Sequence, residues 1–108
     1  MTGSEPGSLA YFAERQPEVA QSLEDLIAVL YKEDVLDGRT RELVFLGIQA
    51  ALRLPRAIRV HVPRAISAGA TPDEIIAAIT LVVPNAGMNA ATEAVGIAAE
   101  VLQDLAES

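Results

Sequence analysis

Apolar residues recur at helical spacing along most of this chain, in segments separated by proline and glycine. No segment alternates between apolar and polar residues for long, and no Asn-Gly type hairpin turn appears. Alanine, the best helix former, supplies 19 of the 108 residues. The chain is therefore predicted to be all-α.

The segments of helical spacing predict six helices that begin or end at these breaks. They are expected over residues 9–15, from 17 to before Asp37-Gly38, and over 39–53, 55–68, 72–83 and 89–106. Pro17, Pro55 and Pro72 suit the first turn of a helix, where the missing N–H costs little. Pro63 lies inside the fourth helix, where we expect a kink or a local loss of hydrogen bonding. The expected architecture is a compact bundle of about five to six helices.

The clearest local signal is the stretch Thr71-Pro72-Asp73-Glu74. Thr71 is expected as the N-cap and Pro72 as the first helical residue. Glu74 is expected as the third helical residue, whose side chain completes a capping box with Thr71. The stretch from Pro84 to Gly87 is expected to end the same helix.

A chain of 108 residues has room for one hydrophobic core. A single helical domain is expected over residues 9–108, after a flexible N-terminal segment at residues 1–8. The helix at 39–53 is apolar nearly all the way round, and the mean hydropathy of +0.30 is high for a small monomer. A homo-oligomer is the expected way to cover this surface, and a monomer with an alanine-diluted apolar interior is the alternative.

Charge and composition exclude several classes of function. A net charge of −7 gives no general attraction to phosphate backbones, so no nucleic-acid partner is expected. The chain has no cysteine, which excludes disulfides, thiolate metal sites, cysteine nucleophiles and thiol redox cycles. With a single histidine, a multi-histidine metal site within one chain is excluded too, and no metal is expected.

The sequence also lacks the signals of export and membrane insertion. The first ten residues have neither the basic region nor the apolar region of a signal peptide. The longest charge-free run, Ile75 to Thr92, is interrupted by Pro84 and Gly87, which argues against a membrane-spanning helix. We therefore expect no membrane partner and a cytoplasmic location.

His61 is the single histidine, and helical phase places it on the apolar face of the helix expected over residues 55–68. Ala57, Ala65 and Ala68 lie around it on that face. Two interpretations are open. His61 is either a core histidine bonded to a backbone carbonyl, or an imidazole that lines a small pocket and acts as an acid or base.

Glu42 and Arg64 are the other candidate site residues. Glu42 lies in the first turn of the helix at 39–53, where it serves either as an acid or base group, or as a complement to the helix dipole or an ion-pair partner of an arginine. Four arginines cluster within twelve residues, at Arg53, Arg56, Arg59 and Arg64. Arg64 alone lies beside His61 on the helix, so it is the one expected to hold a substrate carboxylate.

Three short segments follow one another in a distinctive order. They are LDGRTRELV at residues 36–44, HVPRAISAGATPDEI at residues 61–75 and GMNAA at residues 87–91. They are similar to the patterns L-D-x-x-T-R-E-L, H-x-x-x-A-x-x-x-G-x-T-x-x-E-I and G-x-P-A-A of the carboxymuconolactone decarboxylase family, which includes the alkylhydroperoxidase D-like proteins. The resemblance covers about residues 18–105 and implies an all-α bundle assembled into trimers or hexamers.

The chain departs from the redox branch of that family. This branch carries a CxxC pair seven and four residues before the histidine, and those positions here are Leu54 and Ala57. Arg56 stands where a histidine often lies between the cysteines, so thiol peroxidase chemistry is not expected. The cysteine-free pattern resembles the decarboxylase branch, which works on muconolactone-type acids without a metal or organic cofactor. Asn89 replaces the proline of the third segment and Pro84 is an added proline, which leaves the substrate open.

Two hypotheses about function follow. In the first, the protein is a small oligomeric enzyme acting on an unsaturated carboxylated lactone or oxo-acid, a small-molecule carboxylate. Arg64 would hold the carboxylate, His61 would be the general acid, and Glu42 would orient or charge it. In the second, the protein is a catalytically silent oligomeric module for binding or scaffolding, in which Glu42 and His61 hold the core together.

Overall fold

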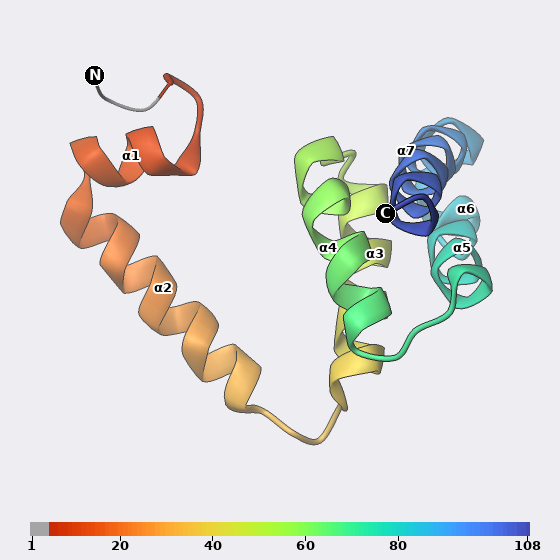
Figure 1. Ribbon diagram of the computed structural model, residues 1–108, viewed down its shortest axis with the longest axis horizontal. Coiled ribbons are helices and arrows are strands. Elements are labelled where there is room, and N and C mark those ends of the chain that lie inside the picture. The colour runs from red at the N-terminus through yellow and green to blue at the C-terminus, as the bar shows by residue number, and fades with distance from the viewer. Residues whose placement is uncertain (1–4) are drawn as a thin grey trace. The chain divides into compact units, whose positions relative to one another are not determined.

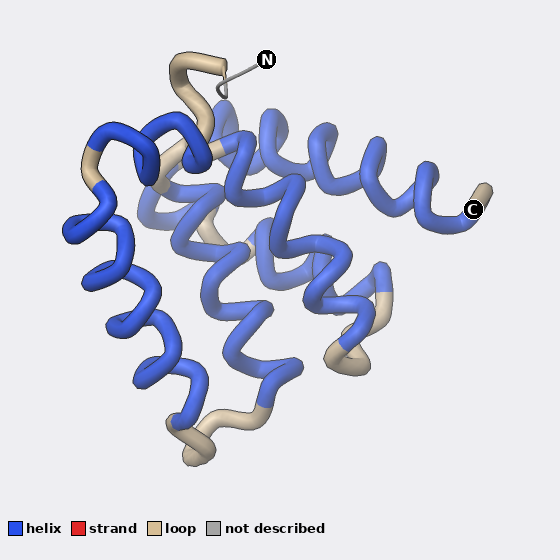
Figure 2. Tube along the Cα trace, turned by 60° about the vertical axis from the view of Figure 1, so that its left-hand side comes forward, coloured by secondary structure: helices blue, strands red, loops and turns tan. Residues whose placement is uncertain are grey.

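The computed structural model of the protein describes residues 5–108. This part of the chain contains seven α-helices and no strand, which confirms the all-α prediction (Figure 2). The helices are α1 Leu9–Arg15, α2 Pro17–Lys32, α3 Gly38–Ala51, α4 Pro55–Ser67, α5 Pro72–Thr80, α6 Val83–Ala86 and α7 Met88–Ala106 (Figure 1). None of the helices in residues 5–108 combines the length and the apolar character needed to cross a bilayer.

The flexible segment expected at residues 1–8 lies partly outside the described residues, which begin at residue 5. Within the described part, Ser8 caps α1, because its hydroxyl oxygen accepts a hydrogen bond from the Tyr11 backbone N–H at 3.0 Å. The helix that follows covers Leu9–Arg15, as the sequence predicts.

Short polar and proline signals set the helix starts. Pro17, Pro55 and Pro72 occupy the first turns of α2, α4 and α5, as predicted. The carboxylate of Asp37 caps α3 by accepting a hydrogen bond from the Thr40 backbone N–H at 2.8 Å. Hydrogen bonds from the backbone and side chain of Thr40 lower the pKa of the Asp37 carboxyl, because they stabilise its charged form.

The capping box at the start of α5 is present. The Glu74 backbone N–H donates to the Thr71 hydroxyl at 3.1 Å, and the Thr71 backbone N–H donates to the Glu74 carboxylate at 2.9 Å. Each side chain thus satisfies a backbone donor that the helix itself leaves without an acceptor.

Thr71→Ala is expected to lower the free energy of unfolding by about 1 kcal/mol, because the hydroxyl acceptor at the α5 N-cap is lost. Thr71→Ser retains the hydroxyl and is the matched control, with an expected change below about 0.5 kcal/mol. Urea unfolding followed by circular dichroism measures both variants. Equal losses in the two variants would contradict the assigned role of the hydroxyl.

Several helix boundaries differ from the predicted ones: α2 ends at Lys32 rather than just before Asp37, and two other differences have a clear cause. The expected helix over 72–83 ends at Thr80, and Pro84 lies in the first turn of a separate short helix, α6. A proline ring clashes with the carbonyl four residues earlier, so α5 cannot continue through Pro84, but the residue fits a new first turn. The helix expected over 39–53 ends at Ala51, because Arg53 takes a left-handed φ of 59° that no α-helix accommodates.

Pro63 lies inside α4, which nevertheless continues from Pro55 to Ser67. The predicted local loss of hydrogen bonding is present, since proline has no N–H to offer the carbonyl of Arg59. Buried residues on both sides of Pro63, Ile58 and Ala65, pack α4 into the core.

The chain divides into two compact units, residues 1–35 and residues 36–108. In the first unit α1 contacts α2, and neither helix has a buried residue. In the second unit α3 packs against α4, α5 and α7, and α7 also packs against α4 and α5 (Figure 1). The single domain predicted over residues 9–108 stays a prediction.

The core of the second unit lies between α3, α4, α5 and α7. Its largest fully buried side chains are Leu46, Ile58, Val62, Ile75 and Ile79. Leu46 and Ala50 bury one face of α3, whereas Val44 and Ile48 on the opposite face are 46% and 50% exposed. The apolar sequence of α3 therefore supplies both a core face and an exposed apolar face.

Candidate functional site

The fold brings Glu42 and His61 into direct contact. Glu42 lies in α3 and His61 in the middle of α4, and these helices pack side by side. The distance from Glu42 Oε1 to His61 Nδ1 is 2.7 Å. The side chain of Glu42 is only 4% exposed and that of His61 is 15% exposed. The two candidates from separate sequence segments thus form one pair.

Which ring nitrogen of His61 contacts Glu42 determines what the pair can do chemically. With Glu42 ionised, the Nδ1–H of His61 donates to the carboxylate, which can only accept. This contact orients the imidazole and leaves Nε2 as the nitrogen that can exchange a proton with a bound molecule. A carboxylate held on one ring nitrogen also stabilises the protonated ring. Histidine–carboxylate pairs of this kind serve as general acids and bases.

Phe45 is a third member of the site that the sequence analysis did not single out. Its ring meets the His61 ring edge to face, with centroids 5.4 Å apart and an interplanar angle of 70°. Edge-to-face packing of this kind restricts rotation of the imidazole. The available signal was the spacing, since Phe45 follows Glu42 by three residues and so lies on a neighbouring part of the same helix surface.

Gln49 lies two helical turns after Glu42 and is also buried, with 9% of its surface exposed. Its Oε1 atom is buried and accepts no hydrogen bond within residues 5–108. A buried amide oxygen in this state favours binding of a donor, such as an ordered water.

Arg64 lies on α4 one turn after His61, and it is exposed to solvent. Two other arginines of the predicted cluster make ion pairs with α7: Arg53 with Glu93 at 3.2 Å, and Arg59 with Glu100 at 2.7 Å. These pairs connect the α4 region to α7, so the cluster does not act as a single anion site. The role of Arg64 as a carboxylate ligand stays a prediction.

The alanines expected around His61 have different environments. Ala65 is fully buried in the core, Ala57 is half-buried and Ala68 is exposed. Only Ala57 and Ala65 are therefore close to the interior side of α4. No group of three His, Cys, Asp or Glu side chains within residues 5–108 is arranged to hold a metal ion.

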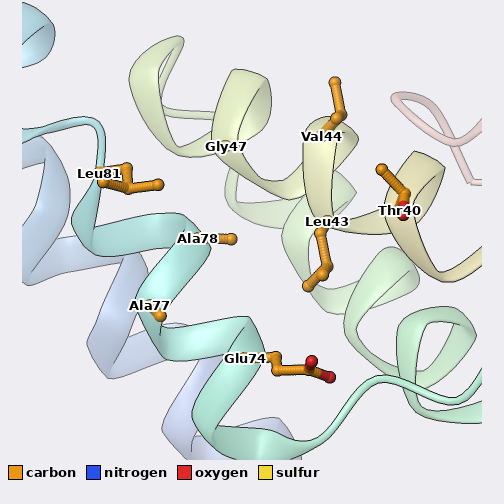
Figure 3. Close-up of a pocket in the computed structure, with 8 residues that line it drawn as sticks. All are labelled: Thr40, Leu43, Val44, Gly47, Glu74, Ala77, Ala78 and Leu81. Atoms are coloured by element: carbon orange, nitrogen blue, oxygen red, sulfur yellow. The ribbon is translucent and has the colours of Figure 1, made fainter. Parts of the chain in front are cut away.

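An apolar groove lies between α3 and α5, away from this pair. Its volume is about 440 Å³, and its lining residues are Thr40, Leu43, Val44, Gly47, Glu74, Ala77, Ala78 and Leu81. Ala78 and Leu81 point toward α3 across the groove (Figure 3). None of the three predicted site residues, Glu42, His61 and Arg64, lines it.

Residues 17–100 match the model of the carboxymuconolactone decarboxylase family. The chain belongs to this family. The matched range contains the whole of the Glu42–His61 pair and Arg64. No curated protein and no solved structure matches the chain.

As a carboxymuconolactone decarboxylase family member, the protein is a cysteine-free representative with an all-α fold. Leu54 and Ala57 stand where the redox branch carries its cysteines, so the chain itself supplies no thiol. The family resemblance read from the three sequence segments is thereby confirmed.

Proposed function

We propose that the protein is a cofactor-independent enzyme that decarboxylates or isomerises an unsaturated carboxylated lactone or a related oxo-acid. The observation that carries this proposal is the 2.7 Å contact between Glu42 Oε1 and His61 Nδ1 in a largely buried setting. Membership of the carboxymuconolactone decarboxylase family supports the substrate class. His61 is the proton-transfer group, and Glu42 is its positioning residue.

In decarboxylation, the bond between the carboxylate carbon and the substrate skeleton breaks and CO2 leaves. The electron pair of that bond passes into the adjacent unsaturated carbonyl system and forms an enolate. The protonated imidazole of His61 then donates its Nε2 proton to carbon, while Nδ1–H stays bonded to Glu42. The neighbouring carboxylate stabilises the cationic imidazole before transfer.

In isomerisation, His61 acts first as a general base and then as a general acid. Neutral His61 removes a proton from carbon through Nε2 and returns it at another carbon of the conjugated system. Glu42 offsets the charge that develops on the ring during the first step.

Arg64 supplies the anion-binding group in this proposal. Arg64 is exposed and follows His61 by three residues on α4, so the two occupy neighbouring positions on the helix surface. A guanidinium can bind a carboxylate through two parallel hydrogen bonds, which would fix the substrate relative to Nε2.

Carboxymuconolactone is the probe that tests the proposal, with CO2 release and loss of the starting lactone as readouts. We expect the unaltered protein to accelerate both, and His61→Ala to lower kcat/KM by at least about 100-fold. Arg64→Ala is expected to raise KM more than it lowers kcat, since its contact is made with bound substrate and transition state alike.

Arg59→Ala is the matched control for Arg64→Ala, because it also removes an exposed arginine of α4, and the guanidinium of Arg59 is bound to Glu100 of α7. It is expected to leave kcat/KM within about twofold, as exposed ion pairs contribute little. No CO2 release by the unaltered protein, or unchanged release by His61→Ala, would contradict the proposal.

A catalytically silent binding or scaffold module is the second candidate function. The burial of the Glu42 carboxylate favours it, because a carboxylate only 4% exposed must be satisfied by a partner for structural reasons alone. In this case His61 is a core histidine and the lactone is not turned over. Unfolding and turnover measurements on Glu42 and His61 variants separate the two candidate functions.

A further inference from the structure

Within residues 5–108 two polar residues are buried, Glu42 and Gln49, and both lie on α3. Glu42 is bonded to His61, whereas the Oε1 atom of Gln49 is buried and has no hydrogen-bond donor in this part of the chain. Taking an amide oxygen out of water without a new donor is unfavourable, and most buried polar groups in folded proteins are satisfied. The unsatisfied oxygen therefore indicates a donor that is supplied by a bound molecule.

Gln49 lies on the same face of α3 as Glu42. It follows Glu42 by seven residues, and an α-helix returns to within about 20° of the same direction after seven residues. Because Glu42 contacts His61 of α4, this face of α3 is turned toward α4. Gln49 is thus a second buried polar residue on the α4 side of α3, about 10 Å further along the helix axis.

The contact between Phe45 and His61 shows which part of α4 is level with Gln49. Residues 52–54 alone join α3 to α4, so the two helices run in opposite directions. Gln49 is one turn beyond Phe45 along α3, and Ala57 is one turn before His61 along α4. Gln49 and Ala57 are therefore level with each other. Ala57 is half-buried, and its methyl group is small and has no hydrogen to donate to an oxygen.

We propose that Gln49 is a specificity-determining residue of the Glu42–His61 site, and that its amide oxygen accepts a hydrogen bond from a hydroxyl group of the substrate. This role rests on the proposed function, because Gln49 acts on the same substrate as His61. It narrows the substrate class to carboxylates that also carry a hydroxyl, such as a hydroxylated lactone or the enol of an oxo-acid. A lactone without a hydroxyl can still react at His61, but it has no hydrogen to donate to Oε1 and binds less tightly.

The three substrate-binding positions follow one another in an order that suits a molecule with a polar group at each end. Arg64 follows His61 by three residues on α4, and Gln49 is level with Ala57, four residues before His61. Along α4, His61 therefore lies between the proposed carboxylate ligand and the proposed hydroxyl ligand. A molecule with these two groups at opposite ends can bind both residues while its unsaturated carbons face the imidazole.

Two small probes that differ by one hydroxyl test this role of Gln49 without any turnover. 4-Hydroxybenzoate and benzoate are planar unsaturated carboxylates, and the hydroxyl of the first lies opposite its carboxylate. Titrations of the whole protein followed by NMR give both dissociation constants. The unaltered protein is expected to bind 4-hydroxybenzoate at least about tenfold more tightly, because benzoate leaves Gln49 Oε1 without a donor.

Gln49→Met keeps the length of the side chain and removes the amide. It is expected to reduce the ratio of the two affinities to below about twofold by weakening the binding of 4-hydroxybenzoate. It is not expected to lower the free energy of unfolding, since Oε1 has no hydrogen bond within residues 5–108 to lose. Gln103→Met makes the same chemical change at an exposed residue of α7 and is the matched control, with an unchanged ratio expected.

The side-chain amide of Gln49 also reports binding directly. The chain has four glutamines, and the NH2 signal that is missing from the spectrum of Gln49→Met belongs to Gln49. This signal is expected to shift when 4-hydroxybenzoate is added and to shift less with benzoate. A purely structural role of Gln49 predicts no difference between the two probes.

Three results would each overturn this role of Gln49: equal affinities of the unaltered protein for the two probes, binding of neither probe, or a preference that persists in Gln49→Met. An ordered water that satisfies Oε1 for structural reasons alone predicts the first result. Circular dichroism verifies that Gln49→Met is folded, and Gln49→Leu is the second variant if it is not. Failure of the proposed function is seen separately, as no CO2 release from carboxymuconolactone, and it leaves the preference between the probes measurable.

Discussion

Leu46→Ala is expected to lower the free energy of unfolding by about 3 kcal/mol. Leu46 is fully buried on α3, at the centre of the contacts that this helix makes with α4, α5 and α7. Removing its outer carbons both loses burial of apolar surface and leaves a cavity that close-packed neighbours fill only in part. Urea unfolding at fixed protein concentration measures the change.

Leu81→Ala makes the same chemical change at a side chain that is 74% exposed, and it serves as the control for Leu46→Ala. Its expected effect is below about 0.5 kcal/mol, since there is little burial to lose. A loss at Leu81 as large as at Leu46 would mean that the core is not where the fold places it.

Glu42→Ala is expected to lower the free energy of unfolding by about 3 kcal/mol, because one partner of a buried hydrogen-bonded pair is removed. His61 Nδ1 then loses its acceptor in a setting where the side chain is 15% exposed. Glu42→Gln retains a side-chain oxygen at the same place and is expected to retain most of the stability. Urea unfolding of both variants measures the difference.

A double-mutant cycle on Glu42 and His61 isolates the contact itself. The double variant Glu42→Ala/His61→Ala is expected to lose less stability than the sum of the single variants, by about 1–2 kcal/mol. Additive losses would show that the 2.7 Å contact contributes nothing to folding.

Kinetics of the same variants separate the two candidate functions. If His61 is the general acid, Glu42→Gln lowers kcat for carboxymuconolactone while the protein stays folded, because the neutral amide no longer stabilises the protonated ring. If the pair is purely structural, the variants change stability and the unaltered protein shows no turnover. Measured together, stability and turnover therefore assign the role of the pair.

Much of the fold follows from local sequence signals. The capping box at Thr71 and the prolines at the starts of α2, α4 and α5 depend on residues a few positions apart, so they could be predicted without tertiary structure. Prediction was least accurate between α5 and α6. Pro84 was expected to end one helix and instead begins another, because a proline near a helix end and one in a first turn look alike in sequence.

The candidate site was predictable only in part. The family motifs identified Glu42 and His61, but not that their side chains are in contact or that Phe45 packs against the imidazole. Helical phase placed Arg64 beside His61 on the same helix, and it could not show that Arg53 and Arg59 are engaged by glutamates of α7.

The sequence by itself determined the helical class, the main helix starts, the absence of thiol chemistry and the family. These properties depend on composition and on neighbours within one or two helical turns. Only the tertiary structure decided the partners of the charged side chains, because these partners lie 19 residues apart for Glu42 and His61 and 40 or 41 apart for the arginine pairs. It also decided which face of α3 is buried, since an apolar helix offers several faces and packing against α4, α5 and α7 selects among them.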